Sequence, residues 1–266
     1  MTDVLLVLAP KPDCYSDKAL SVAENSSPPL GLLYLGTMLK DKGFGVAIED
    51  MHAGNLKPEQ IIQLIEKHKP KILGISASTP TYPNARKMAL LAKEKFPEVK
   101  LVLGGVHATA LPKRCLEESK FDVVVIGEGE LTIVELADFF IKGKGKLNEV
   151  KGIAFKDAGG IHFNLPRQFI KDLDSLPIPD RGLIDLSKYS QKGALVSSRG
   201  CPAQCIYCAC GAFSGRTYRV RSAENLVKEI ECLHDEFGIT QFEFHDDTFT
   251  LFPERVERFC ELLKEK

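Results

Sequence analysis

The sequence predicts an α/β protein: a Rossmann-like or flavodoxin-like, doubly wound parallel sheet in the amino-terminal part, followed by two further β/α units. Short apolar runs rich in Val, Ile and Leu alternate with helical patterns over the first half of the chain. A stretch with a hairpin pattern and a proline-bearing connector then breaks the rhythm, and the alternation restarts near residue 194. The length of 266 residues is enough for two domains.

The first domain is expected to contain five strands and four helices in alternation. Continuous apolar runs suit strands that are buried on both faces of a sheet, and apolar residues at helical spacing suit the helices that cover it. In such sheets, ligands bind outside the carboxyl ends of the strands. The expected strands are 4–8, 45–49, 72–76, 100–104 and 122–126, and the expected helices are 30–42, 58–68, 84–96 and 131–142.

The rest of the chain divides into a connector and a second region. Two apolar runs around the turn 157–160 predict a β-hairpin, and residues 176–180 form the proline-bearing connector. Residues 194–198 and 241–245 predict strands, each with a helix after it, at 223–237 and 254–264. We therefore place the domain boundaries at 1–149, 150–193 and 194–266.

Charge and hydropathy exclude several classes of function. The chain has 35 Lys and Arg against 36 Asp and Glu, so it lacks the basic excess of a general nucleic-acid binder or a polybasic membrane anchor. No apolar run reaches the ~20 residues of a membrane span, and the amino terminus lacks the cationic region of a signal peptide. We expect a cytoplasmic protein, in which the eight cysteines are not paired as disulfides.

Three of the cysteines have the spacing C-x3-C-x2-C directly after a predicted strand: Cys201, Cys205 and Cys208. Three thiolates on one short loop can hold one face of a cubane iron–sulfur cluster and leave the fourth iron open. A structural zinc site is the alternative, but such sites use four ligands in paired C-x2-C spacings, and one pair is visible. Cys210 lies outside the spacing, as an incidental neighbour or as the replacement for a ligand in a damaged site.

The segment around these cysteines resembles the radical S-adenosylmethionine (SAM) superfamily, with Tyr207 in its aromatic position. The Arg-Gly pair before Cys201 and the stretches 215–222 and 244–250 resemble one subgroup, the B12 (cobalamin)-dependent radical SAM family related to anaerobic Mg-protoporphyrin IX monomethyl ester cyclase. The resemblance implies a partial TIM barrel, a [4Fe–4S] cluster on Cys201, Cys205 and Cys208, and S-adenosyl-L-methionine near Tyr207, Asp246 and Asp247. Helix capping is the alternative role for Asp247.

The first domain resembles the cobalamin-binding domain of that subgroup in the stretches 28–36, 76–80, 104–109 and 127–132. Glycines there allow close approach of a large planar corrin, and small hydroxyl residues can bind its nucleotide tail. Glycine-rich loops also occur in Rossmann-like domains that bind no corrin. His52 follows the second strand rather than the first, and we interpret it as a surface residue. The predicted corrin-binding residues are Leu30, Gly31, Ser76, Ser78, Thr79, Gly104, Gly105, His107, Gly127 and Glu128.

The resemblance implies a protein that cleaves SAM to a 5′-deoxyadenosyl radical for methyl transfer or cyclisation on an unknown substrate, with an external electron donor. Residues 194–266 contain two β/α units, counting the strand before Cys201, whereas a barrel core takes roughly 200 residues. We therefore expect a fragment that is too short to be active alone, with an exposed sheet edge open to self-association. The alternatives are a cobalamin-binding module without activity of its own and a flavodoxin-like nucleotide binder.

Overall fold

A seven-stranded sheet in the order β2-β1-β3-β4-β5-β6-β7 forms the first part of the computed structural model, which describes residues 2–11 and 27–266. The first five strands are parallel, and β6 and β7 are antiparallel to their neighbours. The strands are β1 (Val4–Leu8), β2 (Val46–Asp50), β3 (Ile72–Ser76), β4 (Lys100–Gly104), β5 (Val123–Val125), β6 (Ile153–Asp157) and β7 (Gly160–Phe163). The predicted doubly wound parallel sheet is confirmed.

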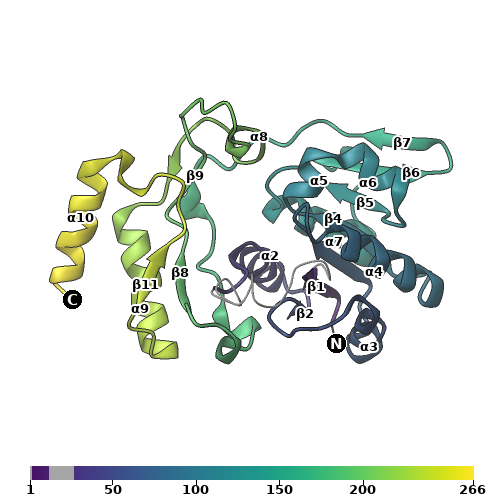
Figure 1. The fold of residues 1–266 in the computed structure, drawn as a ribbon, viewed down its shortest axis with the longest axis horizontal. Coiled ribbons are helices and arrows are strands. Elements are labelled where there is room, and N and C mark those ends of the chain that lie inside the picture. The colour runs from purple at the N-terminus through teal and green to yellow at the C-terminus, as the bar shows by residue number, and fades with distance from the viewer. Residues whose placement is uncertain (1, 12–26) are drawn as a thin grey trace.

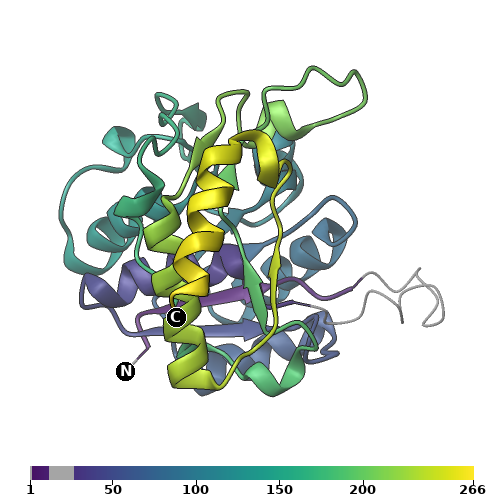
Figure 2. The ribbon, with the colours of Figure 1, turned by 90° about the vertical axis from the view of Figure 1, so that its left-hand side faces the viewer.

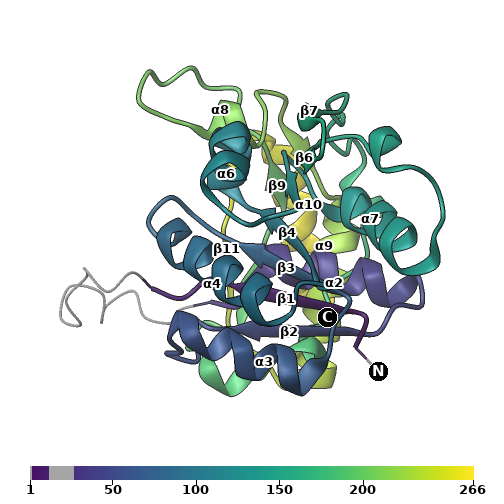
Figure 3. The same ribbon diagram turned by 90° about the vertical axis from the view of Figure 1, so that its right-hand side faces the viewer.

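Helices cover both faces of this sheet, because successive side chains of each strand point to opposite faces. Val4 and Leu6 of β1 pack in one core with α2 (Leu30–Asp41) and α7 (Glu130–Lys142). Leu5 and Val7 pack in a second core on the other face. The helices there are α3 (Ile61–His68) and α4 (Tyr82–Lys95), and Figure 3 shows the two layers on either side of the strands.

The strand order places a topological switch beside β1, because the chain continues from β1 to β2 on one side and to β3 on the other. In doubly wound sheets, ligands bind in the crevice at the carboxyl ends of the strands at such a switch. Two short helices that periodicity did not predict, α5 (Val106–Ala110) and α6 (Pro112–Glu118), follow β4 at this edge. They are shorter than the helical patterns that sequence analysis recognises.

The predicted hairpin forms as β6 and β7, and it pairs with β5 as a continuation of the first sheet. The connector after it has three single 3-10 turns. At the start of each turn, the side chain of an aspartate accepts a hydrogen bond from the backbone N–H two residues further on. These aspartates are Asp172, Asp180 and Asp185. These caps satisfy backbone N–H groups in a segment that makes no sheet hydrogen bonds.

The second region contains two two-stranded sheets and lies on the left of Figure 1. Its longest helices, α9 (Ala223–Phe237) and α10 (Pro253–Lys264), pack side by side over a small core (Figure 2). Ser222 caps α9 by accepting from Asn225 N at 3.1 Å, and Gly238 ends it in the left-handed region. The other elements are β8 (Gly193–Leu195), β9 (Ser198–Arg199), α8 (Cys210–Phe213), β10 (Arg219–Val220) and β11 (Phe242–Phe244).

No helix in the described ranges is long and apolar enough to cross a membrane.

Candidate functional site

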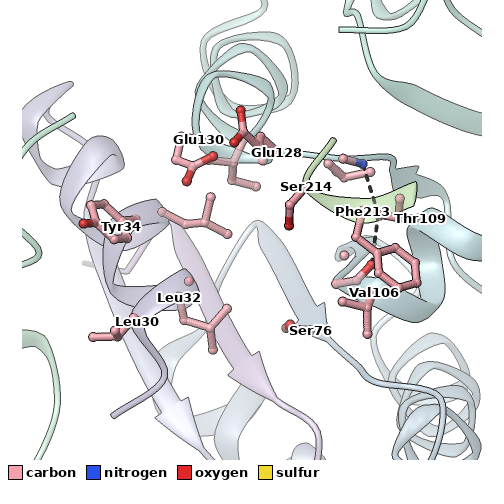
Figure 4. A pocket seen from close by; sticks show the side chains of 18 of the residues that line it. Leu30, Leu32, Tyr34, Ser76, Val106, Thr109, Glu128, Glu130, Phe213 and Ser214 are labelled. Carbon is pink, nitrogen blue, oxygen red and sulfur yellow. Dashed lines mark hydrogen bonds between the residues drawn. The ribbon is translucent and has the colours of Figure 1, made fainter. Parts of the chain in front are cut away.

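A cavity of about 400 Å³ lies between the carboxyl edge of the first sheet and the second region (Figure 4). This volume is in the range of ligand sites in proteins. Its walls come from segments far apart in the sequence: Leu30 and Tyr34 of α2, the end of β3, the loops after β4 and β5, and Arg199 of β9. The short helix α8, which follows the cysteine loop, closes it by packing against α5.

Glycines open the rim of this cavity. A Cβ atom added at Gly31, Gly104 or Gly127 would meet no other atom within 4 Å. The absence of a side chain at these glycines therefore leaves open space. Gly105 and Gly127 also have positive φ angles, of +94° and +81°, and a Cβ at Gly105 would approach Ala77 O to 2.7 Å. The rim therefore fits a large ligand that approaches the backbone closely.

Seven of the ten predicted corrin-binding residues line this cavity: Leu30, Gly31, Ser76, Gly104, Gly105, Gly127 and Glu128. The other three, Ser78, Thr79 and His107, are not among the residues that line it. His107 is 6 % exposed, stacks on Tyr82 and shares a 3.2 Å hydrogen bond with Thr79. Burial lowers the pKa of His107 below its ordinary value.

A guanidinium joins the two parts of the chain at the cavity wall. Arg199 Nη1 donates to Glu128 Oε1 at 3.1 Å, and its Nη2 donates to Glu130 Oε1 at 2.6 Å. Its carbon Cζ lies 5.3 Å from the centre of the Tyr34 ring. Burial alone would lower the pKa of Arg199, but the two carboxylates outweigh it and raise that pKa. The sequence analysis noted the Arg-Gly pair before Cys201 but did not predict the contacts of Arg199 with Glu128 and Glu130.

Glu128 is a hub of this junction. Besides Arg199, Arg219 Nη1 donates to Glu128 Oε1 at 2.7 Å, and Ile170 N donates to its other oxygen at 2.7 Å. Both arginines come from the paired strands β9 and β10, in which Arg199 lies opposite Arg219. The loop after β5 and the strand that leads to Cys201 are therefore fixed to each other.

The cysteine loop lies between β9 and α8. Cys201 N donates to Gly215 O at 3.2 Å, whereas Cys205 and Cys208 are exposed and Tyr207 is 89 % exposed. In the part of the chain that the structure describes, no three His, Cys, Asp or Glu side chains are close enough to hold a metal ion. The donor chemistry fits an iron–sulfur cluster, because one short loop carries three cysteines, whose thiolates are soft ligands for iron.

Cys210 is not an isolated neighbour of the loop. Its thiol donates to Asp247 Oδ2 at 2.9 Å, and Asp247 lines the cavity. Burial, the bond to Asp247 and the nearby Cys201 and Cys208 raise the pKa of Cys210 to about 12. The thiol groups of Cys201, Cys208 and Cys210 therefore lie within electrostatic reach of one another.

The two predicted aspartates after β11 have different surroundings. Asp246 accepts from Ser197 N at 2.7 Å and from Ser198 N at 3.1 Å, so it orders the chain just before β9. Asp247 faces the cavity together with His245. Phe213 and Ser214, which the sequence analysis did not single out, also line the cavity, and Phe213 lies beside Val106 and Thr109 in Figure 4.

Comparison with known families matches both parts of the chain. Residues 17–137 match the B12 binding domain family, and residues 195–266 match the radical SAM superfamily. The first match contains the glycine rim of the cavity, and the second contains the cysteine loop.

Two relatives extend over nearly the whole chain. It is 37 % identical to the uncharacterized methyltransferase PH0819 of Pyrococcus horikoshii, over 95 % of this chain and 55 % of that protein. It is 34 % identical to the anaerobic magnesium-protoporphyrin IX monomethyl ester cyclase of Synechocystis, over 91 % of this chain and 50 % of that protein. The chain thus spans about half the length of these curated relatives.

Solved structures share the fold over the full chain. One is the cobalamin-dependent SAM radical enzyme OxsB, with a TM-score of 0.82 at 22 % identity over 37 % of its own length. Another is the radical SAM methyltransferase TsrM from Kitasatospora setae, with a TM-score of 0.77 at 20 % identity over 51 % of its length. The matches to both domains and the identity to the two curated relatives over nearly the whole chain show that the chain belongs to the B12 (cobalamin)-dependent radical SAM family.

Proposed function

We propose that the chain holds cobalamin in the cavity, a [4Fe–4S] cluster on Cys201, Cys205 and Cys208, and SAM between them, for methyl transfer or cyclisation on a substrate. One observation carries the proposal: the same cavity has the glycine rim of the first domain on one side and Arg199 and Asp247 of the second region on the other. Two cofactors held at these walls would face each other.

The residues of the cavity have separable tasks in this proposal. Gly31, Gly104 and Gly127 leave room for the corrin ring. Leu35, Val106 and other apolar side chains of the wall exclude water from it. Arg199 fixes the strand before Cys201 against the first domain.

When bound, these cofactors supply reductive cleavage of SAM to a 5′-deoxyadenosyl radical and a corrin that carries a methyl group or an electron. In this proposal Asp247 contacts SAM, and its position on the cavity wall and its hydrogen bond from the Cys210 thiol support that role. Ser76 supports the corrin side with a hydroxyl group at the end of β3.

The reaction class follows from two kinds of relative, named as a methyltransferase and as a cyclase. Both reactions are compatible with the same two cofactor sites. An electron donor is required for either, because SAM cleavage consumes an electron.

A second candidate is a cobalamin-binding module without activity of its own. The exposure of Cys205, Tyr207 and Cys208 favours it, because a radical that forms in an open site is quenched by its surroundings. In that case, the first domain binds corrin and the cysteine loop contributes no chemistry.

Anaerobic reconstitution with iron, sulfide and hydroxocobalamin separates these candidates. The proposed function predicts a broad sulfide-to-iron absorbance band that is lost in Cys201→Ala and kept in Cys260→Ala, an exposed cysteine on α10. A corrin spectrum without iron supports the binding module. Material that binds neither cofactor contradicts both.

A further inference from the structure

The charged wall of the cavity indicates which corrins it accepts. Among the described residues that line the cavity, Glu128, Glu130 and Asp247 carry carboxylates and Arg199 carries a guanidinium. Such a wall disfavours an anionic ligand and favours one that presents hydrogen-bond donors.

Glu130 differs from its neighbours in one respect. The residue is 5 % exposed, and its Oε1 is occupied by Arg199, but its Oε2 is buried and has no hydrogen-bond partner. Both oxygens of Glu128 have donors, from Arg199, Arg219 and Ile170. In Figure 4, Glu130 lies between Glu128 and Tyr34 on the cavity wall. A buried acceptor without a donor is costly, so a ligand that brings an N–H group to it is favoured.

We propose that Glu130 is a specificity residue that selects amidated corrins, by accepting a hydrogen bond from a side-chain amide of the corrin ring. The proposal rests on the proposed corrin function of the same cavity. A corrin with free carboxylates presents negative charge where Glu130 needs a donor. Arg199 holds the other oxygen, so the carboxylate is not free to turn away.

The test compares two corrinoids on the full chain by anaerobic absorbance titration. Cobinamide carries side-chain amides, and cobyrinic acid carries carboxylates in their place. We expect the wild type to bind cobinamide at least about tenfold more tightly, and Glu130→Gln to reduce this ratio, since a glutamine side chain both donates and accepts. Glu135→Gln is the control, because Glu135 lies on the same helix and pairs with Arg167 away from the cavity.

Two results overturn this inference while leaving corrin binding intact: equal affinities of the wild type for the two corrinoids, or a ratio that Glu130→Gln does not change. Failure of the wild type to bind either corrinoid overturns the proposed function, and this inference with it. If Glu130→Gln does not fold, Glu130→Asp keeps the charge and shortens the side chain, and we expect weaker cobinamide binding with the preference retained. The wild-type ratio is measured independently of any variant.

Discussion

Arg181 donates from Nη2 to Glu229 Oε1 at 3.0 Å, and both side chains are buried almost completely. Arg181 also donates to Ala194 O at 2.8 Å, and Arg221 contacts the other oxygen of Glu229. Burial lowers the pKa of Arg181, and Glu229 opposes that shift. This cluster joins the connector to α9 and β8, beneath the cavity residue Tyr34, whose hydroxyl lies 3.4 Å from Arg221 Nη1.

We predict that Glu229→Ala destabilises the protein by about 3–5 kcal/mol, because it leaves two buried guanidinium groups without their carboxylate. The measurement is the free energy of unfolding from urea titration. Glu224→Ala is the matched control. Glu224 lies on α9, like Glu229, but it is an exposed partner of Arg258, so its removal should change the free energy of unfolding little. Equal effects of the two substitutions would contradict the role of burial.

Gly200→Ala should disturb the cysteine loop selectively. Gly200 has a φ of +83°, and a Cβ there would collide with Thr217 O. Alanine at a positive φ costs about 1–3 kcal/mol, in addition to that collision. We expect lower iron incorporation with nearly unchanged corrin binding, measured by iron assay and corrin absorbance on one sample. Wild-type iron content in the variant would refute this prediction.

His107 should make stability depend on pH. Burial lowers its pKa in the folded state, Arg114 adds to the shift and Glu118 opposes it. The unfolded chain binds the proton near pH 6.5, and the folded protein binds it at lower pH. Stability is therefore complete above about pH 6.5 and falls as the pH decreases toward the folded-state value.

Urea unfolding at about pH 7.5 and about pH 5.5 tests this dependence. His107→Phe keeps an aromatic ring against Tyr82 and removes the titrating group, so the loss of stability on acidification should shrink. His234→Gln changes an exposed histidine and serves as control. A wild-type slope in His107→Phe would show that other groups cause the dependence.

Arg199→Gln should weaken the link between the two cofactor sites, because Arg199 alone contacts both Glu128 and Glu130 in the described residues. We expect hydroxocobalamin affinity to differ between cluster-free and cluster-loaded wild type, and this difference to shrink in the variant. By linkage, the corrin then also loses its effect on cluster binding. Arg199→Lys keeps the positive charge but lacks the two guanidinium nitrogens that donate to both carboxylates, so it should restore part of the coupling. An undiminished difference in Arg199→Gln would show that the coupling runs elsewhere.

The sequence by itself determined the five parallel strands of the first sheet, most of its helices and the cysteine loop. Strands that are apolar on both faces, such as Val4–Leu8, can be recognised from local composition, and the cysteine loop can be recognised from the spacing of Cys201, Cys205 and Cys208. The glycine rim was also visible, because a residue without a side chain after a buried strand is a local signal. The short helices α5 and α6 were not predicted, since each is too short to show the apolar periodicity of a helix.

Only the tertiary structure decided which of these residues meet. Arg199 contacts Glu130 across 69 positions of sequence, and no local pattern encodes such a pairing. The structure likewise joined Thr79 to His107 by a hydrogen bond, left both out of the cavity lining and placed Asp247 in it. Periodicity and spacing report on neighbours along one element, whereas these contacts depend on how two separately formed units pack together.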